Sequence, residues 1–307
     1  MANFGRAPKD VHPELRRIAR FAPGQLVTPR TLSLMRALSR LQGRRDPADV
    51  EVLTLPSGVG VRVYRPANAK GPGPALLWNH GGGYVIGRAA QDDVLCRRFA
   101  RVLGATVASV DYRLAPEHPY PTPVQDCYSA LTWLALLPAV DPARVAIGGG
   151  SAGGGLAAAL ALLARDRGDV PVAAQLLVYP MLDDRSADRT DLDDASFRLW
   201  NRSSNQFGWD AYLGDANRSV AVPARHEDLS GLPPAWIGVG TLDLFHDEDL
   251  AYGERLKAAG VPCEVHVVPG AFHGFDAVAA KAEVSQSFFN SQCTFLQKAF
   301  TAAGESR

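Results

Sequence analysis

Gly149-Gly150-Ser151-Ala152-Gly153 places one serine among glycines, in the pattern G-x-S-x-G. The apolar residues before it, 144–147, are typical of a strand, and the alanine- and leucine-rich residues 151–165 are typical of a helix. A serine on a sharp turn from strand to helix has a strained backbone, and its neighbours must lack side chains for the turn to close. The pattern therefore indicates an exposed serine nucleophile. A phosphate-binding loop is the alternative, but neither glycine-rich phosphate motif is present.

Outward from this turn, apolar and β-branched runs predict eight strands, and helical patterns fall between the later ones. The expected strands are residues 51–55, 59–65, 75–79, 105–110, 144–147, 173–179, 235–239 and 263–268. The expected helices are residues 123–137, 151–165, 247–259 and 280–300. This alternation predicts an α/β fold, with a mostly parallel sheet flanked by helices on both faces.

Two segments do not fit the alternation. Residues 1–45 form an arginine-rich arm with a helical pattern, and residues 182–230 combine many charges with several aromatic side chains. Because an insertion of this length is rarely a bare loop, we expect 182–230 to be a helical cap, to which the arm contributes. The catalytic core is then expected to comprise residues 46–181 and 231–307, with the cap beyond the carboxyl ends of the strands.

The composition excludes several classes of function. The 307 residues include 32 Lys and Arg against 32 Asp and Glu, so no field of one sign exists to attract nucleic acid or anionic lipid. Residues 1–10 contain no apolar signal region, and the uncharged stretch 145–164 contains six glycines and is no membrane span. Four dispersed cysteines do not suggest disulfides. We therefore expect a cytoplasmic protein.

A second glycine motif, His80-Gly81-Gly82-Gly83, directly follows the expected strand 75–79. Acyl transfer needs hydrogen-bond donors aimed at the oxygen that becomes negative, and a glycine loop can present bare backbone amides to it. We assign the oxyanion hole to the amides of Gly82 and Gly83, with that of Ala152 as the third donor. His80 is expected to brace the loop.

The serine needs a base and an acid. Among the seven histidines, His273 lies in a glycine-containing loop just past the last strand, where it can reach Ser151. In proteins whose serine nucleophile lies in a G-x-S-x-G turn between a strand and a helix, the acid lies between the serine and the histidine in chain order. Asp243 follows the strand 235–239 and is the preferred candidate. Asp247 is the second candidate, although its place at a helix start gives it a capping role, as for Glu248 and Asp249.

Six aspartates cluster in the expected cap, at positions 183, 184, 188, 191, 193 and 194. They match no calcium-loop spacing and have no histidine partners, so a solvated surface paired with Arg185 and Arg189 is expected rather than a metal site. No metal and no organic cofactor is needed for the chemistry assigned here.

The chain resembles the hormone-sensitive lipase-like family of α/β-hydrolases, which includes the bacterial family IV carboxylesterases. Residues 80–84 and 111–121 match its oxyanion motif and a second characteristic stretch, whereas 179–185 and 208–213 resemble its cap segments. Residues 243–248 resemble its acid loop, in which the first aspartate is the triad member. The resemblance thus favours Asp243 and implies an α/β-hydrolase fold.

The chain departs from this family at two positions. Gly150 stands where the family usually has Asp or Thr, and Leu244 stands where a proline usually follows the triad aspartate. Neither departure removes a triad member.

These observations predict a serine carboxylesterase acting on short- to medium-chain acyl esters through Ser151, His273 and Asp243 and an acyl-enzyme intermediate. An amidase or deacetylase using the same triad is an alternative, as is a non-catalytic small-molecule receptor of the same fold. The expected partner is a small ester. The resemblance also implies a homodimer through residues 284–300.

Overall fold

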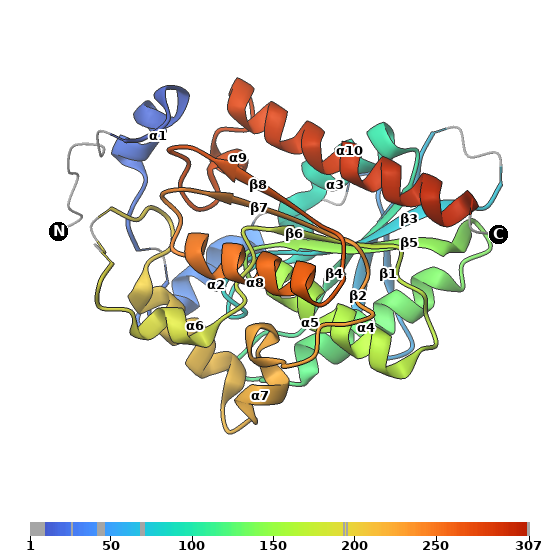
Figure 1. The fold of residues 1–307 in the computed structure, drawn as a ribbon, viewed down its shortest axis with the longest axis horizontal. Helices are drawn as coiled ribbons and strands as arrows, with labels where there is room; N and C mark the ends of the chain where they lie inside the picture. The colour runs from blue at the N-terminus through green and yellow to red at the C-terminus, as the bar shows by residue number, and fades with distance from the viewer. Residues whose placement is uncertain are drawn as a thin grey trace.

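The computed structural model describes residues 10–25, 27–41, 47–67, 71–192, 194 and 196–305. A single twisted sheet runs through the molecule, with helices packed on both of its faces (Figure 1). Parts of the predicted arm, residues 1–9, 26 and 42–45, lie outside the described residues, as do residue 46 of the predicted core and Asp193 of the aspartate cluster.

The sheet contains eight strands in the order β1-β2-β4-β3-β5-β6-β7-β8. They are β1 (Glu51–Thr54), β2 (Gly60–Tyr64), β3 (Gly73–Asn79), β4 (Thr106–Asp111), β5 (Val140–Gly150), β6 (Ala174–Val178), β7 (Ala235–Gly240) and β8 (Cys263–Val268). Pairing is antiparallel between β1 and β2 and between β2 and β4, and parallel elsewhere. The predicted α/β-hydrolase fold with a mostly parallel sheet is confirmed.

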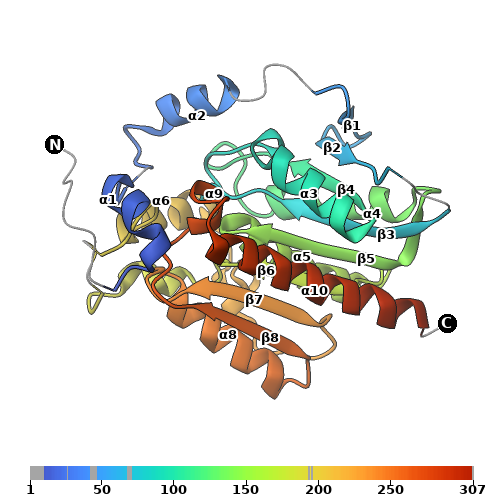
Figure 2. The same cartoon turned by 90° about the horizontal axis from the view of Figure 1, so that it is seen from above.

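The longer helices of the core cover the two faces of the sheet (Figures 1 and 2). On one face lie α3 (Asp93–Leu103) and α10 (Glu283–Glu305), and on the other lie α4 (Thr122–Ala135), α5 (Ala152–Arg167) and α8 (His246–Ala258). Each face has its own apolar core. Central strands such as β6 and β7 are buried along their whole length because helices exclude water from both sides.

The helix α3 has no counterpart among the predicted helices. Its sequence contains an amphipathic pattern, because Cys96, Phe99 and Ala100 are buried at helical spacing whereas the adjacent Arg97 and Arg101 are not. Three arginines in eleven residues lower the mean hydropathy of this stretch, so its narrow apolar face was not recognised as a helical pattern. Gly104 ends the helix in the left-handed conformation, with φ 61°.

Residues 182–230 contain no strand among those described and form short helices instead. These are η3 (Asp184–Asp188), α6 (Arg202–Leu213), α7 (Arg218–Ala221) and η4 (Pro223–Arg225). The N-terminal part adds η1 (Pro13–Leu15), α1 (Arg16–Phe21) and α2 (Leu32–Leu41).

Hydrogen bonds join the N-terminal part to the segment 182–230. The Leu199 amide donates to the Pro23 carbonyl at 2.7 Å, and the Ser204 hydroxyl donates to the Val27 carbonyl at 2.9 Å. The two segments that did not fit the alternation therefore pack against each other. Within the described residues, no helix is both long enough and apolar enough to cross a membrane.

Candidate active site

Ser151 lies on the turn between β5 and α5. Its φ of 57° and ψ of −122° lie outside the backbone regions that residues with side chains usually adopt. Ser151 is the N-cap residue of α5, directly before the first helical turn. The turn closes tightly because Gly153 has no side chain: a Cβ there would lie 2.0 Å from the carbonyl oxygen of Asn79. The glycine after the serine is thus required by close approach to β3.

Three side chains from different loops form a continuous hydrogen-bonded row. His273, in the loop after β8, lies 2.9 Å by its Nε2 from Ser151 Oγ and 2.9 Å by its Nδ1 from Asp243 Oδ2. All three side chains are buried. The Asp243 carboxylate accepts a hydrogen bond from Nδ1–H of His273, which leaves Nε2 free to accept a hydrogen bond from the Ser151 hydroxyl. Sequence reasoning chose these three residues, and the structure brings them together.

The carboxyl of Asp243 is fixed by its own loop. Its Oδ1 accepts the amide of Phe245 at 3.0 Å, which leaves Oδ2 for His273. The ring of Phe245 meets the imidazole edge-on, with centroids 5.2 Å apart, and Tyr179 does so from another side at 4.9 Å. The imidazole is therefore held both by a hydrogen bond and by aromatic packing.

Asp247 is placed away from this row. It is half-exposed at the start of α8 and forms ion pairs with Arg189 at 2.6 Å and with His246 at 2.8 Å. The Arg189 guanidinium holds the pKa of the Asp247 carboxyl below its usual range. The structure separates Asp247 from His273 and gives it a surface role.

The glycine loop after β3 lies directly against Ser151. A Cβ at Gly81 would lie 3.4 Å from the Ser151 Cβ, and one at Gly83 would strike the Trp200 ring at 2.1 Å. Gly83 also has a φ of 57°, so both the contact with Trp200 and the backbone conformation disfavour a side chain at this position. Within the described chain, the amides of Gly82, Gly83 and Ala152 donate to no protein acceptor. Three N–H groups beside the serine are thus free for a ligand oxygen.

His80 has the bracing position expected of it. Its Nδ1 lies 2.8 Å from the Gly81 carbonyl, its ring stacks on Tyr112 at 4.2 Å, and its own carbonyl accepts the Tyr112 hydroxyl. Burial lowers the pKa of His80 and keeps the imidazole neutral. The histidine fixes the entry to the glycine loop and does not contact Ser151 in the described hydrogen-bond network.

A cavity of about 560 Å³ opens beside Ser151 and His273. Its walls include Val27 from the N-terminal part and Leu199 and Trp200 from the segment 182–230. This volume suits a small organic ligand. Both segments outside the alternating pattern therefore contribute to the space next to the serine.

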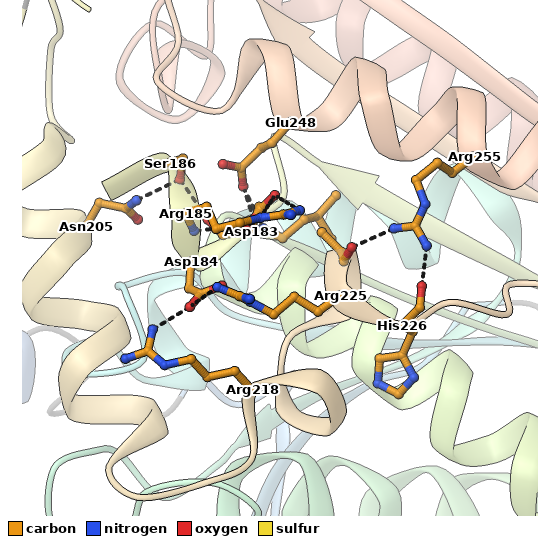
Figure 3. Close-up of polar contacts among 12 residues, drawn as sticks. Asp183, Asp184, Arg185, Ser186, Asn205, Arg218, Arg225, His226, Glu248 and Arg255 are labelled. Atoms are coloured by element: carbon orange, nitrogen blue, oxygen red, sulfur yellow. Dashed lines mark hydrogen bonds and ion pairs between the residues drawn. The ribbon is translucent and has the colours of Figure 1, made fainter. Parts of the chain in front are cut away.

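Sequence reasoning missed a buried carboxyl that joins α8 to the segment 182–230. Glu248 Oε1 accepts the amides of Leu182 at 2.8 Å and Asp183 at 3.0 Å (Figure 3). Burial raises the pKa of Glu248 to about 8 despite these hydrogen bonds, and it raises that of Asp249 as well. Glu248 and Asp249 lie in the first turn of α8, as expected, but Glu248 binds the amides at 182 and 183 and the Asp249 side chain is buried.

The aspartate cluster divides into two kinds of residue. Asp183 pairs with Arg185 and Asp191 with Arg189 at the surface, as predicted. Asp184 instead is 4% exposed and is held between Arg218 and Arg225 (Figure 3). Among the described residues, no group of three or more His, Cys, Asp or Glu side chains could hold a metal ion.

Glu248 should make stability depend on pH. A carboxyl with a raised folded pKa favours the folded state in its protonated form, so its contribution is complete below about pH 4.5 and is lost as the pH rises through about 8. Glu248→Gln keeps the acceptor oxygen and carries no charge. Calorimetry should give both proteins similar Tm values at pH 5, and a Tm at least about 3 °C higher for the variant at pH 9.

The control for this experiment is Glu254→Gln on the exposed side of the same helix, where Glu254 pairs with Lys257. This variant should follow the wild-type Tm at every pH. A difference between Glu248→Gln and wild type that stays constant from pH 5 to pH 9 would show that burial of the charge is not the cause.

The sheet order, the serine turn after β5 and the histidine loop after β8 together define an α/β-hydrolase. Comparison with known families agrees, because a family described as having the α/β-hydrolase fold matches residues 76–277, more than half of the chain. The chain belongs to this family, as its resemblance to hormone-sensitive lipase-like proteins predicted.

Individual relatives are named as esterases. The chain is 41% identical over 236 residues to the esterase LipI of Mycobacterium tuberculosis, covering 72% of each protein. It is 38% identical over 226 residues to the carboxylesterase NlhH of the same species, covering 71% of each. Among solved structures, a bacterial heroin esterase superposes with a TM-score of 0.85 at 38% identity, covering 95% of this chain and 98% of that one.

Proposed function

We propose that the chain is a serine carboxylesterase that hydrolyses short- to medium-chain acyl esters through an acyl-enzyme intermediate. The observation that carries this proposal is the row of two 2.9 Å contacts from Ser151 through His273 to Asp243, at the wall of a cavity. The naming of relatives such as LipI as esterases supports the reaction class.

In the first half of the proposed reaction, Ser151 Oγ attacks the ester carbonyl carbon while His273 Nε2 accepts the hydroxyl proton. Asp243 holds the imidazole with Nδ1 protonated and stabilises the imidazolium that forms. The serine oxygen replaces the carbonyl π bond, and the electron pair moves onto the carbonyl oxygen. The 2.9 Å contact supports direct proton transfer without an intervening water.

The negative oxygen needs donors that are already in place. The amides of Gly82, Gly83 and Ala152 are proposed to bind it, since they are otherwise unused and border the serine. Ala152 is also the first residue of the sixteen-residue helix α5, whose N-terminal dipole favours negative charge. These groups would bind the tetrahedral intermediate more tightly than the ester.

Collapse of the intermediate expels the alcohol, which takes the proton from His273. Water then enters, gives a proton to His273 and attacks the acyl carbon, and the carboxylic acid leaves as Ser151 regains its proton. This cycle balances without a metal or an organic cofactor. The acyl group would occupy the cavity that adjoins the serine.

We further propose that residues 182–230, together with the N-terminal part, act as the cap over the core formed by 46–181 and 231–307. Trp200 and Val27 both line the cavity, and hydrogen bonds at Leu199 and Ser204 tie the two segments to each other. Residues from outside the core would thus shape the substrate space. Pairing of two copies through residues 284–300 stays a prediction.

Hydrolysis of p-nitrophenyl esters from acetate to palmitate tests this function. The cavity volume of about 560 Å³ should admit short and medium acyl chains, so kcat/KM should peak there and fall steeply for palmitate. A folded protein that cleaves no ester of any length contradicts the proposal. Cleavage of matched amides or ligand binding without turnover would then indicate an amidase or a receptor.

A further inference from the structure

The cavity beside Ser151 extends to two carboxyl groups that the proposed reaction does not use. Asp92, at the end of η2 (Ala89–Asp92), and Asp276, in α9 (Phe275–Val278), both line it. Within the described chain neither carboxyl forms an ion pair. Asp92 Oδ2 accepts the indole N–H of Trp78 at 2.8 Å, and Asp276 Oδ1 accepts the Tyr179 hydroxyl at 2.7 Å. The cavity therefore has an acidic wall, defined here as Asp92 and Asp276.

The absence of a side chain at position 150 leaves room beside the acidic wall. A Cβ at Gly150 would lie 3.6 Å from Tyr179 Cε2 and 3.9 Å from Trp78 Cζ2, which is ordinary contact. A side chain at this position would thus begin in contact with both rings whose polar groups bind the carboxyls. Gly150 is one of the departures from the family pattern, and it places no side chain against the rings of Trp78 and Tyr179.

No other side chain that lines the cavity forms an ion pair with the acidic wall in the described structure, although a positive charge on His273 would lower the pKa of Asp276. Arg98 also lines the cavity, but its guanidinium lies 3.7 Å over the Phe289 ring and donates to Gln286. The hydroxyl of Ser285 is another lining group; its residue is 3% exposed, and the hydroxyl has no hydrogen-bond partner in the described structure. An unsatisfied buried hydroxyl is costly unless a ligand engages it.

Burial has a measurable consequence for the two carboxyls. Loss of hydration raises the pKa of Asp92 to about 7, although the Trp78 hydrogen bond opposes this rise, and the nearby charge of Asp276 adds to it. Burial raises the pKa of Asp276 as well. A positive charge placed near two such buried carboxyls stabilises their ionised forms.

We infer that the acidic wall binds an alkylammonium group, so that the enzyme prefers ester substrates carrying such a cation over uncharged esters of the same shape. The inference rests on the proposed esterase function and names its substrate class. The ammonium group would restore the counter-charge that Asp92 and Asp276 lack. The aromatic rings of Trp78 and Tyr179 beside it suit a cation with apolar substituents.

The test compares esters that differ only in charge. Choline butyrate and neohexyl butyrate have the same shape, with nitrogen in one replaced by carbon in the other. For a charge in the acyl part, the pair is the p-nitrophenyl esters of γ-trimethylammonio-butyrate and δ,δ-dimethylhexanoate. In at least one pair, kcat/KM should favour the cation by about tenfold, the ratio that an aromatic and acidic site provides for a desolvated cation.

Asp92→Asn and Asp276→Asn keep an oxygen for the Trp78 and Tyr179 hydrogen bonds and remove the charge. Each should lower the cation-to-neutral ratio at least about fivefold. Asp210→Asn, on the exposed side of α6, removes the same charge outside the cavity and should leave the ratio unchanged. A ratio near one in both pairs, a ratio that the wall variants do not lower, or a preference for anionic esters would overturn the inference.

Binding separates this inference from the proposed reaction. Calorimetry on the Ser151→Ala protein should show choline binding more tightly than neohexanol, and Asp92→Asn in that background should remove the difference. If no ester is hydrolysed but this difference is present, the proposed function fails and the acidic wall still binds cations. If esters are hydrolysed and choline and neohexanol bind alike, the inference fails and the esterase stands.

Discussion

Replacement of Ser151 by alanine should lower kcat for p-nitrophenyl butyrate by about 10⁶-fold, because no other group can form the acyl-enzyme bond. The 2.9 Å contact to His273 Nε2 makes this serine the one positioned for activation. The cost to folding should be small, since the side chain is a single hydroxyl with one hydrogen-bond partner. Steady-state kinetics and thermal unfolding of the same preparation measure both effects.

A matched control is Ser203→Ala in α6, an exposed serine whose hydroxyl accepts the Gln25 side chain. Its kcat should stay within about twofold of wild type, the range typical of surface substitutions. Residual turnover of Ser151→Ala above about one hundredth of wild type, from folded protein, would remove Ser151 from the proposed role.

Replacement of Asp243 by asparagine should lower kcat by about 10⁴-fold, because an amide at this position favours the wrong tautomer of His273. The carboxylate lies 2.9 Å from Nδ1 and is 4% exposed, so water cannot substitute for it. KM should change much less, since the acid does not contact the ester. Kinetics with p-nitrophenyl butyrate give the split between kcat and KM.

Asp247→Asn is the paired control, four residues along the same loop and helix. Its carboxylate meets Arg189 and His246 at the surface, so only a small change in kcat is expected, within about twofold. If Asp247→Asn proves more damaging than Asp243→Asn, the acid of the proposed triad lies at 247 and the geometry described here is not the reactive one.

The parts of the site that the sequence predicted are those built from backbone geometry. Gly153 is required because Asn79 approaches it closely, and Gly83 is required because its φ is positive. Since only glycine meets these requirements, they are visible in the sequence as glycine motifs. The glycines in turn locate Ser151 and the amides beside it. His273 could be found because the strand before it ends at the same edge of the sheet.

The parts that the sequence did not predict depend on side chains meeting across long separations. Glu248 looked like a helix-start residue because acids are common there, yet its partners are the amides at 182 and 183, some 65 positions away. Asp92 and Asp276 share a cavity although they lie 184 positions apart in the sequence. Asp184 likewise resembled its exposed neighbours, but it is buried and pairs with Arg218 and Arg225, which lie 34 and 41 positions further along the chain.

The most direct measurement is peptide mapping by mass spectrometry after the protein is mixed with p-nitrophenyl acetate and quenched in acid. We expect an acetyl group on the peptide that contains Ser151, formed within one turnover and absent from Ser151→Ala. The variant His273→Ala lacks the base, so this acetyl group should form more slowly in it. Rapid ester turnover with Ser151 unmodified, or acetyl groups that appear equally in Ser151→Ala, would show that Ser151 is not the nucleophile.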